Sequence, residues 1–238
     1  MRSLYFFLLL LSCLVHAQNR GGILIQTNRG DSLYTNYAMF SGGYYSESAY
    51  IRIDDKKGRK LTINEVNHVE GFDQKGDYRY IVPLRRPTSS YTFWGERLEK
   101  TERATIYYTD FSSSSWSQTV RLRPSNLYYT FDKSSLTKLN YSNVKGDVSE
   151  FPSAQPHMKK SKALQITQAI MYTAGAGMII YGIAKTFEPI PPDPDGSPGI
   201  GGPNLHPTVF VGALFINVPF FMTSAKQKHL RKALMAVE

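Results

Sequence analysis

Short stretches in which apolar and polar residues alternate run from Gly22 to about Val148 and are separated by turn residues. A period of two is typical of antiparallel β-strands that bury one face, and no helical period competes with it here. The pattern predicts three β-hairpins, at residues 23–26 with 32–37, 50–54 with 60–63, and 66–72 with 78–82. Further strands are expected at residues 104–109, 118–122 and 128–131. Pro83 and Pro87 cannot donate to a β-ladder, so we expect the third hairpin to end there.

Strands this short must protect their edges by closing on themselves or by packing against a second layer. We therefore expect an antiparallel β barrel or sandwich over residues 18–150, followed by a C-terminal α-helical hairpin, in a mainly β protein. Residues 151–162, which include two prolines, are expected to form a linker.

Two long apolar runs follow, at residues 163–187 and 207–223. The second has seventeen residues, at the lower limit of the roughly 17 to 25 that cross a bilayer as a helix. The prolines of residues 188–199 exclude both helix and strand between the runs. Residues 163–238 are thus expected to be an apolar helical hairpin with a basic C-terminal tail. A membrane-spanning hairpin and a soluble hairpin buried on the β domain both fit this pattern.

Small residues are expected where the two helices meet, because lipid provides no hydrophobic force between helices and close packing must replace it. Ala169, Thr173 and Gly177 recur at every fourth position and share one face of a helix. If Phe187 and Pro207 are level, Gly182 comes beside Gly212, and Gly177 comes beside Asn217. Asn217 is then expected to bond the backbone at Gly177; a bond to the β domain or to water is the alternative. Pro219 should kink the second helix.

The first seventeen residues have the pattern of a secretory signal peptide. Arg2 is followed by an apolar run of about twelve residues, roughly 18 Å as a helix, which is too short to span a hydrocarbon core. We expect cleavage after Ala17. A buried N-terminal helix and lipoprotein processing at Cys13 are the alternatives.

The net charge of the chain is +9, and it falls to +8 when Arg2 is removed. A positive net charge is compatible with binding to nucleic acid. An exported protein, however, meets anionic lipid headgroups rather than nucleic acid, so we expect headgroups to be the partner. The basic residues expected to contact headgroups flank the two apolar runs: Lys159, Lys160, Lys162, Lys226, Lys228, Arg231 and Lys232.

Recognisable catalytic motifs are absent from the sequence. A single cysteine excludes a disulfide framework and cysteine-ligated metal centres, and the histidines are scattered without ligand spacing. The sequence therefore predicts no enzymatic activity, no cofactor and no metal. Trp94 and Trp116 could stack on a sugar beside the carboxylates of Glu96 and Glu99, which would suit a glycan site.

The order of motifs resembles a group of uncharacterised exported proteins from Bacteroidetes-type bacteria. The motifs that carry this resemblance are at residues 22–25, 30–33, 69–72, 76, 78–80, 97–98, 106–108, 128–129, 136–139 and 226–233. The resemblance implies a small β domain with a glycine-rich apolar tail, and it implies no activity for any residue.

Two functions are consistent with these patterns. The first is an exported, membrane-tethered module of the cell envelope, with its β domain on the periplasmic side, that takes part in interaction or assembly without enzymatic activity. Its partners would be membrane lipid and an envelope protein or glycan. The second is a glycan-binding or hydrolytic β domain for which the hairpin is only a tether.

Overall fold

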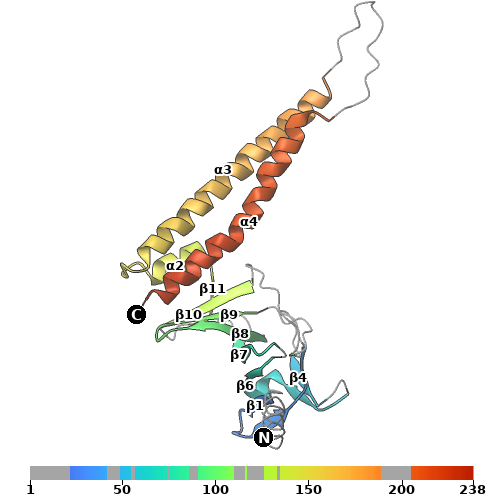
Figure 1. Ribbon diagram of the computed structural model, residues 1–238, viewed down its shortest axis with the longest axis vertical. Helices are drawn as coiled ribbons and strands as arrows, with labels where there is room; N and C mark the ends of the chain where they lie inside the picture. The colour runs from blue at the N-terminus through green and yellow to red at the C-terminus, as the bar shows by residue number, and fades with distance from the viewer. Residues whose placement is uncertain are drawn as a thin grey trace, which may run out of the picture. The chain divides into compact units, whose positions relative to one another are not determined.

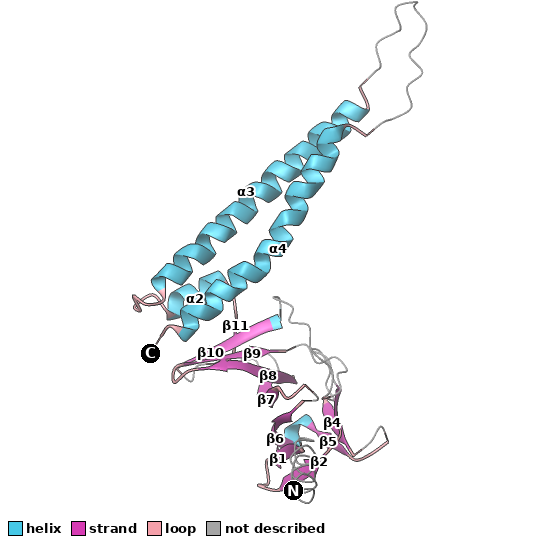
Figure 2. Cartoon of the chain, in the orientation of Figure 1, coloured by secondary structure: helices cyan, strands magenta, loops and turns pink. Residues whose placement is uncertain are grey.

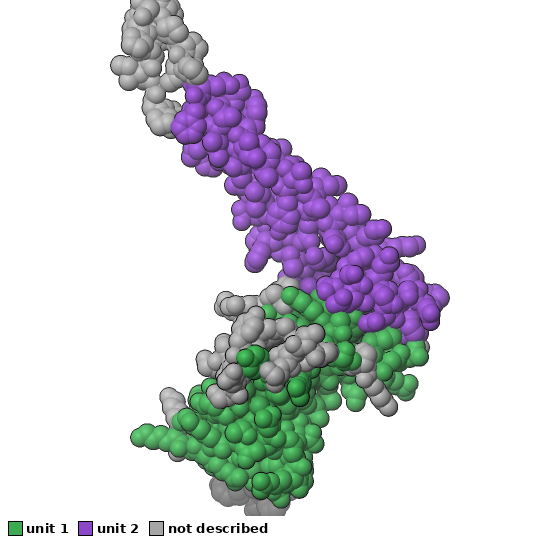
Figure 3. Space-filling view, turned by 180° about the vertical axis from the view of Figure 1, so that it is seen from behind, with its two compact units in different colours: residues 1–139, 238 green, residues 140–237 purple. Residues whose placement is uncertain are grey.

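The computed structural model describes residues 22–41, 49–54, 57–73, 75–85, 91–109, 116, 126–132, 135–188 and 205–237. The chain divides into two compact units, residues 1–139 with residue 238, and residues 140–237 (Figure 3). The predicted signal peptide and the predicted strand at residues 118–122 lie outside the described residues.

An eight-stranded antiparallel sheet forms the main layer of the first unit, in the order β11-β10-β9-β8-β7-β6-β1-β2 (Figure 1). Its strands are β1 (Ile23–Thr27), β2 (Ser32–Thr35), β6 (Val66–Phe72), β7 (Tyr78–Arg85), β8 (Thr92–Lys100), β9 (Ala104–Tyr108), β10 (Leu127–Phe131) and β11 (Thr137–Lys138). The strands at its two ends, β11 and β2, are not paired with each other. The sheet is therefore not a closed barrel, and that part of the expectation was wrong.

A second, three-stranded sheet supplies another layer. It contains β3 (Ala38–Ser41), β4 (Tyr50–Ile53) and β5 (Lys60–Thr62), and a 3₁₀ turn, η1 (Ile63–Glu65), follows β5. Phe40 of β3 is fully buried and meets Trp94 of β8 edge to face, with 5.2 Å between ring centroids. Burial of large aromatic rings between the layers supplies much of the apolar area that stabilises such a unit.

The three predicted hairpins are confirmed as β1–β2, β4–β5 and β6–β7. The third differs at its end, because β7 continues through Pro83 to Arg85 and pairs with β8. Strand β6 pairs with β7 only as far as Ile81, so Pro83 lies where β7 has a neighbour on one side only. A missing N–H costs little at such a position.

The second unit is helical (Figure 2). A short helix, α2 (Tyr141–Asp147), precedes two long antiparallel helices, α3 (Gln155–Thr186) and α4 (Pro207–Met235), and packs against the ends of both. Helix α3 begins inside the expected linker, so residues 155–162 are helical. Pro156, which favoured a linker, lies in the first turn of α3, where a proline needs no N–H partner and fits the helix.

Candidate functional site

The α3–α4 hairpin carries the largest exposed apolar surface among the described residues. Both helices are long and apolar enough to cross a membrane, and only 17% and 11% of their most apolar windows are buried. The large apolar side chains exposed on the two helices are Ile166, Ile170, Tyr172, Ile180, Tyr181, Ile183, Phe210, Val211, Leu214, Val218, Phe220 and Phe221.

The contact between the helices is lined by glycines. A Cβ placed on Gly175 would lie 2.8 Å from the carbonyl oxygen of Gly212, and one placed on Gly212 would lie 2.7 Å from the carbonyl oxygen of Gly175. A Cβ on Gly182 would meet Thr208 and Val209. Only glycine permits so close an approach of two backbones, so these three residues fix the spacing of the hairpin.

The predicted contact face was wrong in part. Gly182 and Gly212 do lie at the contact, but Gly212 faces Gly175, seven residues away from the expected partner along α3. Ala169, Thr173 and Gly177 are exposed, and nothing lies within 4 Å of a Cβ on Gly177. Apart from Met158 in the first turn, the residues buried along α3 instead recur at every seventh position: Ser161, Gln168, Gly175 and Gly182. A seven-residue repeat is the signature of left-handed helix pairing, whereas a four-residue repeat favours right-handed crossing.

Asn217 does not reach Gly177. Its side chain is exposed, and its Nδ2 donates to the carbonyl oxygen of Ala213, 2.8 Å away and one turn earlier in α4. The side-chain amide of an asparagine in an apolar helix can thus donate to a carbonyl of its own helix. The prediction considered only partners on the other helix and therefore missed this bond.

Gln168 is a buried polar residue at the helix contact that has hydrogen-bond partners on α4. Its Nε2 donates to the carbonyl oxygen of Pro219 at 2.7 Å and to Oγ1 of Thr223 at 3.0 Å. Its Oε1 accepts a hydrogen bond from Nζ of Lys226 at 3.1 Å. The amide is therefore satisfied at both ends, which removes the cost of burying it between apolar helices.

The seven predicted basic residues gather at the base of the hairpin, on the first turns of α3 and the last turns of α4 (Figure 1). We call them the basic collar. Lys226 and Arg231 are half-buried, and the other five are exposed. No aspartate or glutamate occurs in either helix, so the collar has no acidic neighbour within α3 or α4. The opposite end carries a local ion pair, in which Nζ of Lys185 lies 2.5 Å from Oε1 of Glu188.

The first unit does not offer the predicted glycan site. Trp94 and Trp116 are 1% and 5% exposed, so neither indole is available to stack on a ligand. Aromatic rings of this size are more effective as core residues of a small β unit than as exposed platforms.

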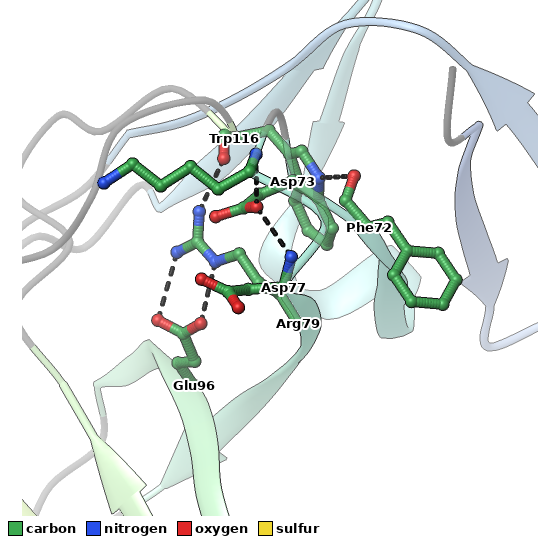
Figure 4. Close-up of polar contacts among 7 residues, drawn as sticks. Phe72, Asp73, Asp77, Arg79, Glu96 and Trp116 are labelled. Carbon is green, nitrogen blue, oxygen red and sulfur yellow. Dashed lines mark hydrogen bonds and ion pairs between the residues drawn. The ribbon is translucent and has the colours of Figure 1, made fainter. Parts of the chain in front are cut away.

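The carboxylate of Glu96 is also occupied, as Figure 4 shows. Arg79 is 5% exposed, and its Nε and Nη2 donate to the two carboxylate oxygens of Glu96 at 2.7 and 3.0 Å. Its Nη1 donates to the carbonyl oxygen of Trp116 at 2.7 Å, and the indole of Trp116 donates to the carbonyl oxygen of Phe72 at 3.1 Å. This bidentate pair satisfies both charges and holds Trp116 in place, which is a structural role.

Beneath Trp116 the chain requires glycine. Gly71 has φ +153°, and a Cβ there would lie 2.8 Å from the carbonyl oxygen of Gly22 and 3.5 Å from the ring of Trp116. Any side chain would therefore disturb the β1–β6 pairing and the position of the indole.

The opposite face of the large sheet carries an aromatic and charged cluster that motif searching did not identify. The guanidinium of Arg97 lies 3.8 Å from the ring centroid of Tyr80, and His68 stacks on the same tyrosine at 5.0 Å. Tyr78 donates a hydrogen bond to Glu70, which, with partial burial, raises the pKa of Tyr78 to about 12. We call His68, Glu70, Tyr78, Tyr80 and Arg97 the outer-face cluster. Its signal in the sequence is the spacing of these residues by two along β6 and β7.

Among the described residues, no group of three or more histidine, cysteine, aspartate and glutamate side chains could hold a metal ion. Comparisons of the chain with protein-family models, with curated proteins and with solved structures give no match. The roles of the hairpin and of the outer-face cluster are therefore inferred from their geometry alone.

Proposed function

We propose that the protein is an exported, membrane-tethered module of the cell envelope, anchored by the α3–α4 hairpin and without enzymatic activity. The observation that carries this proposal is the exposed apolar surface of both helices around a glycine-lined contact. In water such a surface would favour association, whereas in a bilayer it is matched by lipid chains.

The length of the apolar surface agrees with this role. The bond between Lys226 and Gln168 marks the level at which polar groups begin, so the membrane-spanning segments are residues 169–187 and 207–223. The eighteen helical residues from 169 to 186 rise about 27 Å, close to the ~30 Å thickness of a hydrocarbon core. The basic collar then lies at the headgroup level, where lysine side chains are favourable beside anionic lipid.

Two rules give opposite orientations for the hairpin. The positive-inside bias would put the collar in the cytoplasm. A cleaved signal peptide would put the β unit, and with it the collar, on the periplasmic side. We favour the second orientation, because a translocated domain determines topology more strongly than a few flanking charges.

The outer-face cluster supports interaction as the role of the β unit. Tyrosine and arginine are enriched where proteins meet, since they combine apolar area with hydrogen-bond donors. An envelope protein or glycan is the expected partner. A glycan-hydrolysing role has no support from Trp94, Trp116 and Glu96, which are buried or already paired.

Membrane fractionation of matched arginine variants tests the anchor. Ile180 on α3 is 69% exposed, and Tyr34 on β2 is 76% exposed, so both positions have room for a longer side chain. An arginine near the middle of a membrane helix costs about 2.5–3.5 kcal/mol of insertion free energy. We expect Ile180→Arg to shift the chain from the carbonate-resistant membrane fraction to the soluble fraction or to degradation, and Tyr34→Arg to behave as wild type.

Two results would contradict the anchor. One is release of the wild-type chain by alkaline carbonate, which removes peripheral proteins. The other is equal membrane retention of Ile180→Arg and Tyr34→Arg, which would mean that residue 180 does not contact lipid.

A further inference from the structure

Two histidines from different helices meet at the base of the hairpin. The rings of His157 on α3 and His229 on α4 are stacked, with 5.9 Å between centroids and 27° between planes. Both lie beyond the membrane-spanning segments, at the level of the basic collar. The Nδ1 atoms of both rings are buried and have no hydrogen-bond partner in the part of the chain that the structure describes.

The charges around the pair are nearly all positive. Lys160 of α3 and Lys228 and Lys232 of α4 act on His229 directly. The third element packed here, α2, contributes one lysine and one aspartate, Lys145 and Asp147. Burial first, and then the charges of His157 and the three lysines, lower the pKa of His229 from its usual value.

We propose that the base of the hairpin binds the phosphate groups of anionic lipids together with a proton, which is taken up at His229 where it stacks on His157. This inference rests on the membrane attachment proposed above and adds a regulation to it. A phosphate held by Lys160, Lys228 and Lys232 offsets the positive potential that, together with burial, lowers the pKa of His229. The stacked pair then accepts a proton, and the added charge strengthens the hold on the phosphate.

Linkage makes the effect reciprocal. If an anionic lipid raises the proton affinity of the pair, acidification must raise the affinity for the lipid by the same factor. Couplings between two sites are usually 5–150-fold, and we expect about tenfold here. Without the lipid the sign is opposite: the pKa of His229 is lowered in the folded base, so the contribution of this residue to stability is complete above the ordinary histidine pKa and is lost as pH falls below it.

Proton uptake on lipid addition tests the proposal. The full chain in a non-ionic maltoside detergent at pH 6.5 is titrated with short-chain phosphatidylglycerol, and the protons taken up are measured with a pH indicator. We expect uptake by the wild-type chain and by His206→Gln, which changes a histidine at the other end of the hairpin. We expect none with short-chain phosphatidylcholine, and almost none for the double variant His157→Gln/His229→Gln.

Equal uptake by His206→Gln and His157→Gln/His229→Gln would overturn the proposal, since the protons would then come from elsewhere. Replacing the exposed lysines, as Lys228→Gln/Lys232→Gln, should reduce uptake and weaken phosphatidylglycerol binding at pH 5.5 more than at pH 8.0. The same loss at both pH values would also overturn it. The assay works in detergent, so a failed fractionation test would remove the membrane anchor without changing this result.

Discussion

At the scale of single residues, one ion pair is an exception to the usual rule that charged side chains face solvent. Arg79 is buried between Tyr78 and Tyr80, which are more exposed, because its guanidinium is paired with the inward carboxylate of Glu96. The inward carboxylate of Glu96 also interrupts the apolar alternation of β8, the nine-residue strand that the apolar pattern missed. Alternation in one strand cannot reveal a partner in another, so this pair was not predictable from the sequence.

Removing one member of the pair should be costly. In Arg79→Met the carboxylate of Glu96 and the carbonyl of Trp116 lose their partners, and we expect the free energy of unfolding to fall by about 3 kcal/mol. The double variant Arg79→Met/Glu96→Met should recover most of the loss, because two apolar side chains leave no buried charge. Urea unfolding followed by tryptophan fluorescence is a suitable measurement, since both tryptophans lie in the first unit.

A surface pair provides the control. Arg103 and Asp132 lie 3.2 Å apart with side chains 40% and 51% exposed. Arg103→Met should cost less than 1 kcal/mol, as is usual for exposed pairs. Similar losses of unfolding free energy for Arg79→Met and Arg103→Met would show that breaking the buried pair costs no more than breaking an exposed one.

At the scale of elements, local signals were predictable and contacts between elements were not. The hairpins β1–β2, β4–β5 and β6–β7 are short-range structures whose turns contain glycine, and the sequence identified all three. The contact face of α3 was missed because the apolar run at residues 163–187 has no continuous polar face that would distinguish the exposed side from the side turned to α4. Its best signal was Gln168, a polar residue seven positions before Gly175.

A matched pair of glycine variants tests the contact face. Leucine at Gly175 would collide with the backbone of Gly212, whereas leucine at Gly177 would project into open space. Both changes improve helix propensity equally, so packing alone separates them. We expect Gly175→Leu to lower the thermal stability of the hairpin in detergent, measured by circular dichroism of the helices, and Gly177→Leu to leave it unchanged or higher. A larger loss for Gly177→Leu would restore the four-residue contact face.

At the scale of the whole molecule, the sequence predicted a β unit followed by a helical hairpin, and the structure divides the chain near residue 139. The sheet order was not predictable, because it depends on pairing between distant segments. The start of α3 was missed for a local reason, because Pro156 is compatible both with a linker and with the first turn of a helix. If the hairpin crosses a membrane as proposed, its base and its tip must lie on opposite sides of the bilayer.

Cysteine labelling checks this topology. Ser161 is fully buried and would resist labelling in any orientation, whereas Lys162 at the base and Glu188 at the tip are exposed. In a Cys13→Ala background, an impermeant maleimide added from the periplasmic side should modify Lys162→Cys and spare Glu188→Cys until the membrane is opened. Modification of both from one side would mean that the hairpin does not cross the bilayer.

The seven-residue spacing along α3 has a consequence for how this chain can change in evolution. Each residue of helix turns the chain by about 100°, so deleting one residue between Gln168 and Gly175 would rotate one of them out of the contact face. Loss or gain of seven residues returns the chain to nearly the same face. The contact face therefore tolerates changes of length in steps of two turns, provided that both helices change together, while single insertions between these points should be eliminated by selection.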